Sequence, residues 1–306
     1  MDAGSLIVLV VVLGAGLGLS YWADRARTDR SALVGLYLLF GIPGLLLTIW
    51  GVAALTFGGS DGPLFLSVGL ALTLPLVPSF RRALGRVLPL DPASPIDMCG
   101  LALLLTTCAI FTVLLINIGS SPGDLEIESV GLLELGFTAL FELGLAYLAV
   151  GWRVRRNLNE ATARLGISLP NWKTVLIAIG FVVVAFVGGT IGSILTAVFQ
   201  PELSDQIAVV TEEMTSDVQN PFGAVILGAS AGIGEEALFR GAIQPRFGIV
   251  LTSLAFALVH SQYGLSFVIL GLFLVGVTLG IERKYFGTPA AMITHAIFNV
   301  IAVLLQ

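Results

Sequence analysis

The sequence predicts an all-α fold, a polytopic transmembrane helical bundle of about ten spans. Three observations support this fold class: the composition, the length of the apolar stretches, and the placement of the basic residues. Of the 306 residues, 56% are hydrophobic and 11% are charged, and the mean hydropathy is +0.97. Water cannot solvate a surface so poor in charge, so the composition excludes a soluble protein or a nucleic-acid-binding protein and places the chain in a lipid bilayer.

Apolar stretches of membrane-spanning length recur along the whole chain. A helix needs about 20 apolar residues to cross a hydrocarbon core of about 30 Å. We expect spans near residues 4–22, 33–57, 63–79, 98–118, 130–151, 173–199, 222–240, 247–262, 264–282 and 288–305. The first stretch lacks the basic residues that precede a cleavable signal, so it should remain as a helix.

The basic residues follow every second predicted span. Loops on the cytoplasmic side retain Lys and Arg. All 15 such residues in the chain fall in these alternate connections, at Arg25, Arg27, Arg30, Arg81, Arg82, Arg86, Arg153, Arg155, Arg156, Arg164, Lys173, Arg240, Arg246, Arg283 and Lys284. The connections between them carry acids only, at Asp61, Asp124, Glu126, Glu128, Glu202, Asp205, Glu212, Glu213 and Asp217. The alternation predicts a multi-pass protein of the plasma membrane with both termini outside.

Two adjacent carboxylates occur inside the seventh predicted span. Insertion of an ionisable side chain into the lipid core costs about 2.5 kcal/mol or more of free energy, so each such residue within a span is a functional candidate. Glu236 and Arg240 are four residues apart and can pair on one helix face. Glu235 points about 100° away and has no local partner, which favours it as a general base. The structural alternative is an ion-paired helix end at the membrane surface.

The only two histidines lie in the spans that follow. His260 closes the run Phe256-Ala257-Leu258-Val259-His260, and His295 precedes Asn299 by one helical turn. A single histidine is more often a satisfied core residue than part of a site. Polar clusters on the seventh, eighth and tenth predicted spans instead predict one cavity that is open to the cytoplasm, with His260 at its floor.

These three motifs carry a resemblance to a known family. Glu-Glu-x-x-x-Arg, Phe-x-x-x-His and His-x-x-x-Asn, in this order on three apolar segments, resemble the CPBP family, which groups CAAX prenyl proteases with bacterial and archaeal Abi-type membrane proteins. The resemblance covers residues 222–305. It implies an intramembrane endopeptidase that cleaves membrane-associated peptides, prenylated CAAX-type tails among them. Residues 173–306 would form the catalytic domain, and residues 1–172 would be transmembrane helices of unknown role.

The resemblance also assigns roles to the motif residues. Glu235 and His260 would activate the attacking water, while His295 and Asn299 would stabilise the oxyanion. Glu236 and its counter-ion Arg240 would support them. Zn²⁺ is a candidate cofactor, because His260, His295 and Glu235 could ligate it as in a metalloprotease. The His-Glu-x-x-His helix of soluble zinc peptidases is absent, so a metal-free mechanism stays open.

Two other functions compete with the peptidase. A catalytically silent scaffold or immunity-type protein could retain the motifs for packing alone. An ion-coupled transporter could use Glu134 and Glu142, which are eight residues apart in the fifth predicted span. The acidic outer connections, with 13 Arg against two Lys, suggest a prokaryotic source that lives in high salt.

Overall fold

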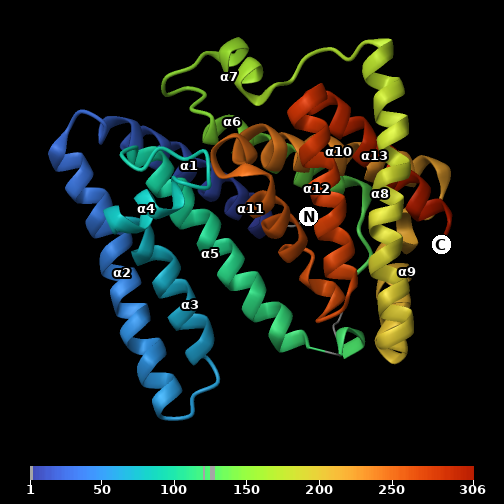
Figure 1. Ribbon diagram of the computed structural model, residues 1–306, viewed down its shortest axis with the longest axis horizontal. Coiled ribbons are helices and arrows are strands. Elements are labelled where there is room, and N and C mark those ends of the chain that lie inside the picture. Colours follow the sequence, from blue (N-terminus) through green and yellow to red (C-terminus); the bar gives the residue numbers. More distant parts are fainter. Residues whose placement is uncertain (1–2, 120, 125–127) are drawn as a thin grey trace.

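The computed structural model describes residues 3–119, 121–124 and 128–306, so Glu126 of the acidic connections lies outside the described residues (Figure 1). Within these ranges the chain forms helices, and the one strand-like feature is an isolated bridge between Trp152 and Arg156. The all-α prediction is confirmed.

The described elements follow the predicted stretches closely. The α-helices are α1 Ala3–Arg25, α2 Arg30–Thr56, α3 Gly62–Thr73, α4 Pro78–Leu84, α5 Pro95–Ile118, α6 Leu132–Ala149, α7 Leu158–Leu165, α8 Trp172–Phe199, α9 Pro201–Thr215, α10 Pro221–Glu236, α11 Gln244–Leu258, α12 Val268–Phe286 and α13 Thr288–Leu304. The 3-10 segments are η1 Leu74–Leu76, η2 Pro122–Asp124, η3 Ser216–Val218 and η5 Ser261–Tyr263, and η4 Ala237–Ile243 is π-helical.

Fewer helical stretches than expected qualify as candidate membrane spans. Six helical stretches in the described residues are long and apolar enough to cross a membrane, or seven if a bent pair that includes α3 counts as one span. The count of ten is therefore not confirmed. One reason is length, because α3 has 12 residues and reaches only about 18 Å. Another is that α10, η4 and α11 count together as one stretch of 38 residues, Pro221–Leu258, although the backbone breaks at Gly248, near the start of the second of the two expected spans.

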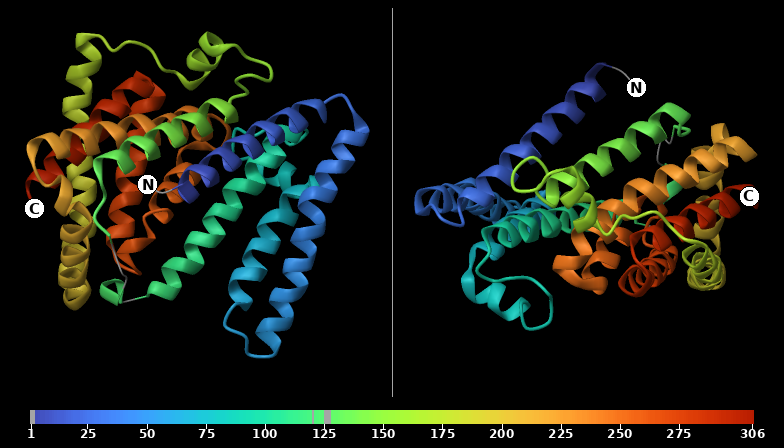
Figure 2. Two further views of the ribbon diagram at one scale, coloured as in Figure 1. Left: turned by 180° about the vertical axis from the view of Figure 1, so that it is seen from behind. Right: turned by 90° about the horizontal axis from the view of Figure 1, so that it is seen from above.

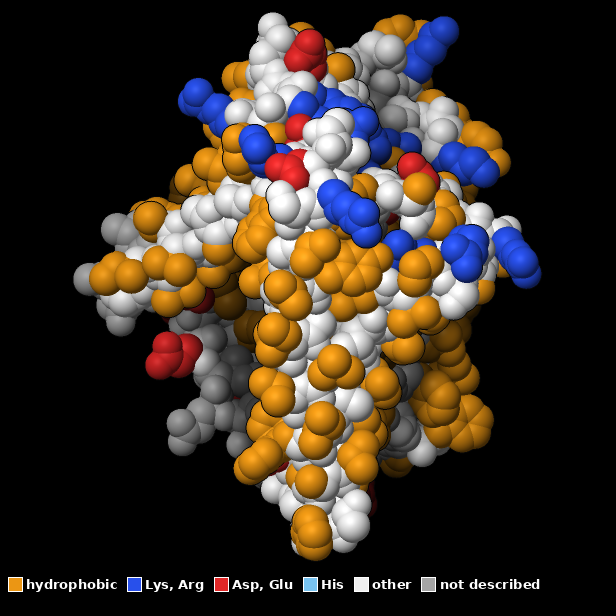
Figure 3. Space-filling model, turned by 90° about the vertical axis from the view of Figure 1, so that its left-hand side faces the viewer, with side chains coloured by type: hydrophobic (Ala, Val, Ile, Leu, Met, Phe, Trp, Pro, Cys, Tyr) orange, Lys and Arg blue, Asp and Glu red, His pale blue; other side chains and the backbone are white. Residues whose placement is uncertain are grey.

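The outer surface of the bundle is apolar. Large side chains such as Leu46 on α2 and Val183 on α8 are more than 60% exposed. Figure 3 shows a broad apolar band on one face, with Lys and Arg side chains gathered above it toward one end. An apolar girdle with basic residues at its edge is typical of a protein that spans a bilayer. The chain is a multi-pass membrane protein.

The helices form two flanks with the site region between them. In Figure 1, α2 and α3 stand on one flank and α8 on the other, where α8 packs on α12 and α13. Figure 2 shows α6 and α10 side by side, both steeply inclined to α8. Two buried clusters meet at η4: Phe239 packs with residues of α5 and α11, while Ala237 packs with residues of α6 and α7.

The sequence explains why the helix changes form at η4. Pro245 has no N–H to bond the carbonyl of Gly241, and its ring crowds that carbonyl, so a regular α-helix cannot run through this point. A π-helical turn absorbs the misfit between Ala237 and Ile243. The backbone then breaks again at Gly248, whose φ of 76° suits a residue without a side chain.

Candidate active site

The small residues of α10 bring two of the motifs together. A Cβ atom on Gly228 would lie 2.5 Å from the carbonyl oxygen of Ala296, and one on Gly232 would lie 2.5 Å from that of Met292. Helix α10 can therefore approach the backbone of α13 far more closely than bulkier residues would permit. The last turn of α10, which carries Glu236, comes to lie against His295.

Glu236 lies at the centre of a fully buried polar cluster. Its Oε1 accepts a hydrogen bond from His295 Nδ1 at 3.0 Å, and its Oε2 forms an ion pair with Arg240 Nε at 3.3 Å. Arg240 also donates from Nη2 to the carbonyl oxygen of Gly276 at 3.3 Å. Neither Glu236 nor Arg240 is exposed to any extent. The expected pairing of Glu236 with Arg240 is confirmed, even though the turn between them is π-helical.

Phe256 links this cluster to the second histidine. Its ring centre lies 4.6 Å from the Arg240 guanidinium carbon, 5.8 Å from the His295 ring and 5.0 Å from the His260 ring. The His260 Nδ1 forms a 2.8 Å hydrogen bond with the carbonyl oxygen of Phe256. A carbonyl oxygen only accepts, so Nδ1 carries the proton and neutral His260 keeps a free lone pair on Nε2.

His260 does not lie within a helix as the expected span 247–262 implied. Helix α11 ends at Leu258, and His260 directly precedes the 3-10 turn η5. The helix is shortened because Gly264, with φ of 59°, turns the chain back against Gly119 at the end of α5.

The remaining predicted site residues, Glu235 and Asn299, lie on the same helices as Glu236 and His295 but make fewer contacts. Glu235 is half-buried, and its Oε2 is buried without a hydrogen-bond partner among the described residues. This agrees with the expectation that Glu235 lacks a local partner. Asn299 is half-buried one turn beyond His295 on α13. The structure therefore joins Glu236, Arg240 and His295 directly and places His260 at their edge through Phe256.

Two further carboxylates belong to this region and were not assigned to it from the sequence. A Cβ atom on Gly234 would lie 2.5 Å from Oε2 of Glu142, which the transporter alternative had paired with Glu134. Glu134 is exposed in the first turn of α6. Glu282 is fully buried and accepts a 2.7 Å hydrogen bond from Thr294, the neighbour of His295. Sequence spacing carries no sign of either contact, because both join different helices.

The zinc prediction involves His260, His295 and Glu235. Within the described part of the chain, no three His, Cys, Asp or Glu side chains are placed so that they could hold one metal ion. The side chains as they stand do not assemble the expected zinc ligand set. Zinc binding stays a prediction, which loss of activity on chelation and its restoration by added zinc would test.

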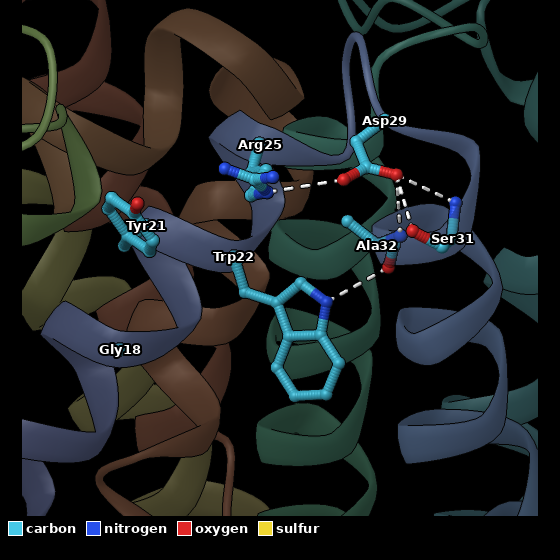
Figure 4. A pocket seen from close by; sticks show the side chains of 7 residues that line it. All are labelled: Gly18, Tyr21, Trp22, Arg25, Asp29, Ser31 and Ala32. Atoms are coloured by element: carbon cyan, nitrogen blue, oxygen red, sulfur yellow. Dashed lines mark hydrogen bonds and ion pairs between the residues drawn. The ribbon is translucent and has the colours of Figure 1, made fainter.

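Two surface pockets lie outside the polar cluster. Figure 4 shows the first, of about 500 Å³, between α1 and α2, where Trp22 Nε1 donates to the carbonyl of Ala32 and Arg25 pairs with Asp29. The second, of about 420 Å³, lies between α5, α11 and α12 and has an apolar lining. Its wall includes Ala257, three residues before His260.

Comparison with known families identifies the same segment that carries the motifs. Residues 217–301 match the family described as type II CAAX prenyl endopeptidase Rce1-like. Neither the curated proteins nor the solved structures include a match to the chain. The match contains all six predicted site residues, and it excludes α6 with Glu142.

Proposed function

Since residues 217–301 match the type II CAAX prenyl endopeptidase Rce1-like family, we propose that this protein is an intramembrane endopeptidase. The observation that carries the proposal is the buried contact between Glu236 on α10 and His295 on α13. It joins residues of two motifs that are 59 positions apart in the sequence. Glu235 directly precedes Glu236, and the His260 imidazole lies against Phe256 at the edge of the cluster. A base, hydrogen-bond donors and an apolar wall are what peptide hydrolysis requires.

Glu235 and His260 activate the attacking water in the proposed reaction. Glu235 Oε2 has no hydrogen-bond partner among the described residues, so it can accept a proton from the water. The Nε2 lone pair of neutral His260 can accept a hydrogen bond from the same water. The hydroxide equivalent then attacks the carbonyl carbon of the scissile peptide bond.

His295 and Asn299 stabilise the oxyanion that this attack creates. In its imidazolium form, His295 donates from Nδ1 to Glu236 and keeps an Nε2 N–H that can donate to the oxyanion. The Asn299 carboxamide offers a second donor from the same helix. Arg240 neutralises Glu236. Its guanidinium also lies over the Phe256 ring, and that ring contacts both imidazole rings. Glu236 and Arg240 are therefore positioning residues.

The proposed substrate is a membrane-associated peptide with a lipid or apolar tail, of which prenylated CAAX-type peptides are one example. The mostly apolar pocket between α5, α11 and α12 supports this, because it could hold such a tail and its wall includes Ala257 of α11, the helix that precedes His260. The predicted placement of the basic residues on the inner side supports a site that faces the cytoplasm.

Cleavage assays on the protein in liposomes test the proposal. Glu235→Gln and His260→Ala should each abolish cleavage of a farnesylated CAAX peptide while the protein still accumulates in membranes. Glu134→Gln is the matched control, since Glu134 is exposed on α6, and it should retain full activity. A scaffold would tolerate Glu235→Gln in cells, and a transporter would lose function at Glu134; either result would refute the peptidase.

A further inference from the structure

Helices α1 and α6 run in the same direction and end together at one surface of the bundle (Figure 2). Midway along both helices, a Cβ atom on Gly144 of α6 would lie 3.1 Å from the side chain of Leu13 on α1. At their ends, Arg155 Nη1 lies 3.7 Å from Asp24 Oδ1. The two ends therefore form one corner of the protein, which lies outside the family-matched residues 217–301.

Beyond α6, residues 151–156 fold into a compact turn that carries three arginines. The carbonyl oxygen of Gly151 accepts hydrogen bonds from the N–H groups of residues 154–156 at 3.0–3.3 Å, so the turn is closed on itself. Within the described residues, Arg153 is the one non-glycine residue with a positive φ, of 67°. Such a conformation is unfavourable for a long side chain and is found more often at functional sites. The Arg153 guanidinium carbon lies 5.0 Å from the centre of the Trp152 ring.

The corner carries more cations than its acids can balance. Arg27 and Arg155 share one oxygen atom, Asp24 Oδ1, at 3.3 and 3.7 Å. Arg153 is exposed and takes part in none of the ion pairs among the described residues. Glu160, the next acid along the chain, is used in the capping box that begins α7. Arg27, Arg153 and Arg155 together therefore leave a positive charge at the corner.

The corner lies where the protein surface meets lipid. Helix α1 is an outer helix, on which Val8 and Val11 are more than 60% exposed, and Tyr21 is exposed near its end. Aromatic and basic side chains at the end of an apolar span are typical of a membrane interface. Figure 3 views the flank where α1 ends and α2 begins, and Lys and Arg side chains gather there above the apolar band. A lipid headgroup can therefore reach the arginines from the adjoining leaflet.

We propose that Arg27, Arg153 and Arg155 bind the phosphate of one anionic phospholipid. Guanidinium groups donate in a fixed fork that matches phosphate oxygens. The headgroup must be anionic, because a zwitterionic one brings its own cation to a corner with excess arginine. A lipid suits the corner better than a soluble anion or an acidic peptide, since its acyl chains can lie along the exposed apolar side of α1. The bound lipid joins α1 to the turn after α6, apart from the proposed peptidase site.

Native mass spectrometry of the full-length protein in neutral detergent tests the site, because it resolves the protein with no lipid, one lipid or more and gives the Kd of the first. Phosphatidylglycerol should bind at least about tenfold more tightly than phosphatidylcholine with the same acyl chains, on the basis of about fivefold per arginine. Arg153→Gln and Arg155→Gln should each weaken phosphatidylglycerol binding about fivefold, and the double variant about 25-fold. Arg82→Gln is the matched control, since Arg82 is exposed on α4, and it should bind as the wild type does.

Asp24→Asn should change the affinity in the opposite direction. It removes the carboxylate that competes with phosphate for Arg27 and Arg155, so phosphatidylglycerol should bind more tightly, a gain that misfolding cannot produce. Weaker binding by this variant would overturn the proposal. Equal Kd values for the two lipids, or an equal loss in Arg82→Gln, would also overturn it, because binding would then be a general attraction to the basic surface. Binding of inorganic phosphate or of a polyglutamate peptide as tightly as phosphatidylglycerol would exclude the lipid as the specific partner.

Discussion

Replacing Arg240 by methionine should destabilise the protein strongly, because the ion pair with Glu236 is fully buried. Both side chains have no exposed area, and their charged atoms are 3.3 Å apart. Removal of one partner of a buried pair costs about 3–5 kcal/mol, since the other charge is left uncompensated. His295 still donates to Glu236, so we expect about 3 kcal/mol, or roughly a 100-fold change in the unfolding equilibrium.

A double-mutant cycle measures this pair in mixed detergent and SDS micelles, with unfolding followed by circular dichroism. The variants are Arg240→Met, Glu236→Gln and both together. If the loss in Arg240→Met arises from a stranded carboxylate, the double variant should recover at least half of it, because no charge is then left unpaired. A double variant as unstable as Arg240→Met, or an Arg240→Met protein as stable as the wild type, would refute this reasoning.

Further substitutions test the packing around the site. Thr294→Val should cost about 1–3 kcal/mol of unfolding free energy, because it removes the hydroxyl that donates to the buried Glu282; an unchanged denaturation midpoint would contradict this. Gly192→Ala on α8 should cost about 1–3 kcal/mol, because its Cβ would lie 2.6 Å from the carbonyl oxygen of Phe267. Gly180→Ala, with no atom within 4 Å of its Cβ, should be neutral or slightly stabilising, so equal midpoints for the two alanine variants would argue against close contact between α8 and the segment that begins α12.

Features that depend on residues close together in the chain could be predicted from the sequence. The apolar stretches predicted helices, and each stretch lies on one or more of them. The spacing of Glu236 and Arg240 predicted their ion pair, because the spacing alone sets which side chains of one helix face each other.

The number of spans could not be predicted in the same way. Hydropathy reports the apolar length of a segment, whereas crossing a membrane requires an unbroken helix of sufficient length. Pro245 and Gly248 alter the backbone between two apolar segments, and the short helix α3 ends before it reaches the far side of a bilayer. The end of α11 before His260 likewise depends on a turn that packs against α5.

The sequence by itself determined that the chain is an apolar helical bundle and which polar side chains it carries within its last third. Only the tertiary structure decided that Glu142 lies against Gly234, and that Phe256 lies between Arg240 and the two imidazole rings. The physical reason is that periodicity fixes which face of a helix a residue occupies. The neighbour of that face depends on how closely the small residues of α6, α10 and α13 allow their backbones to pack.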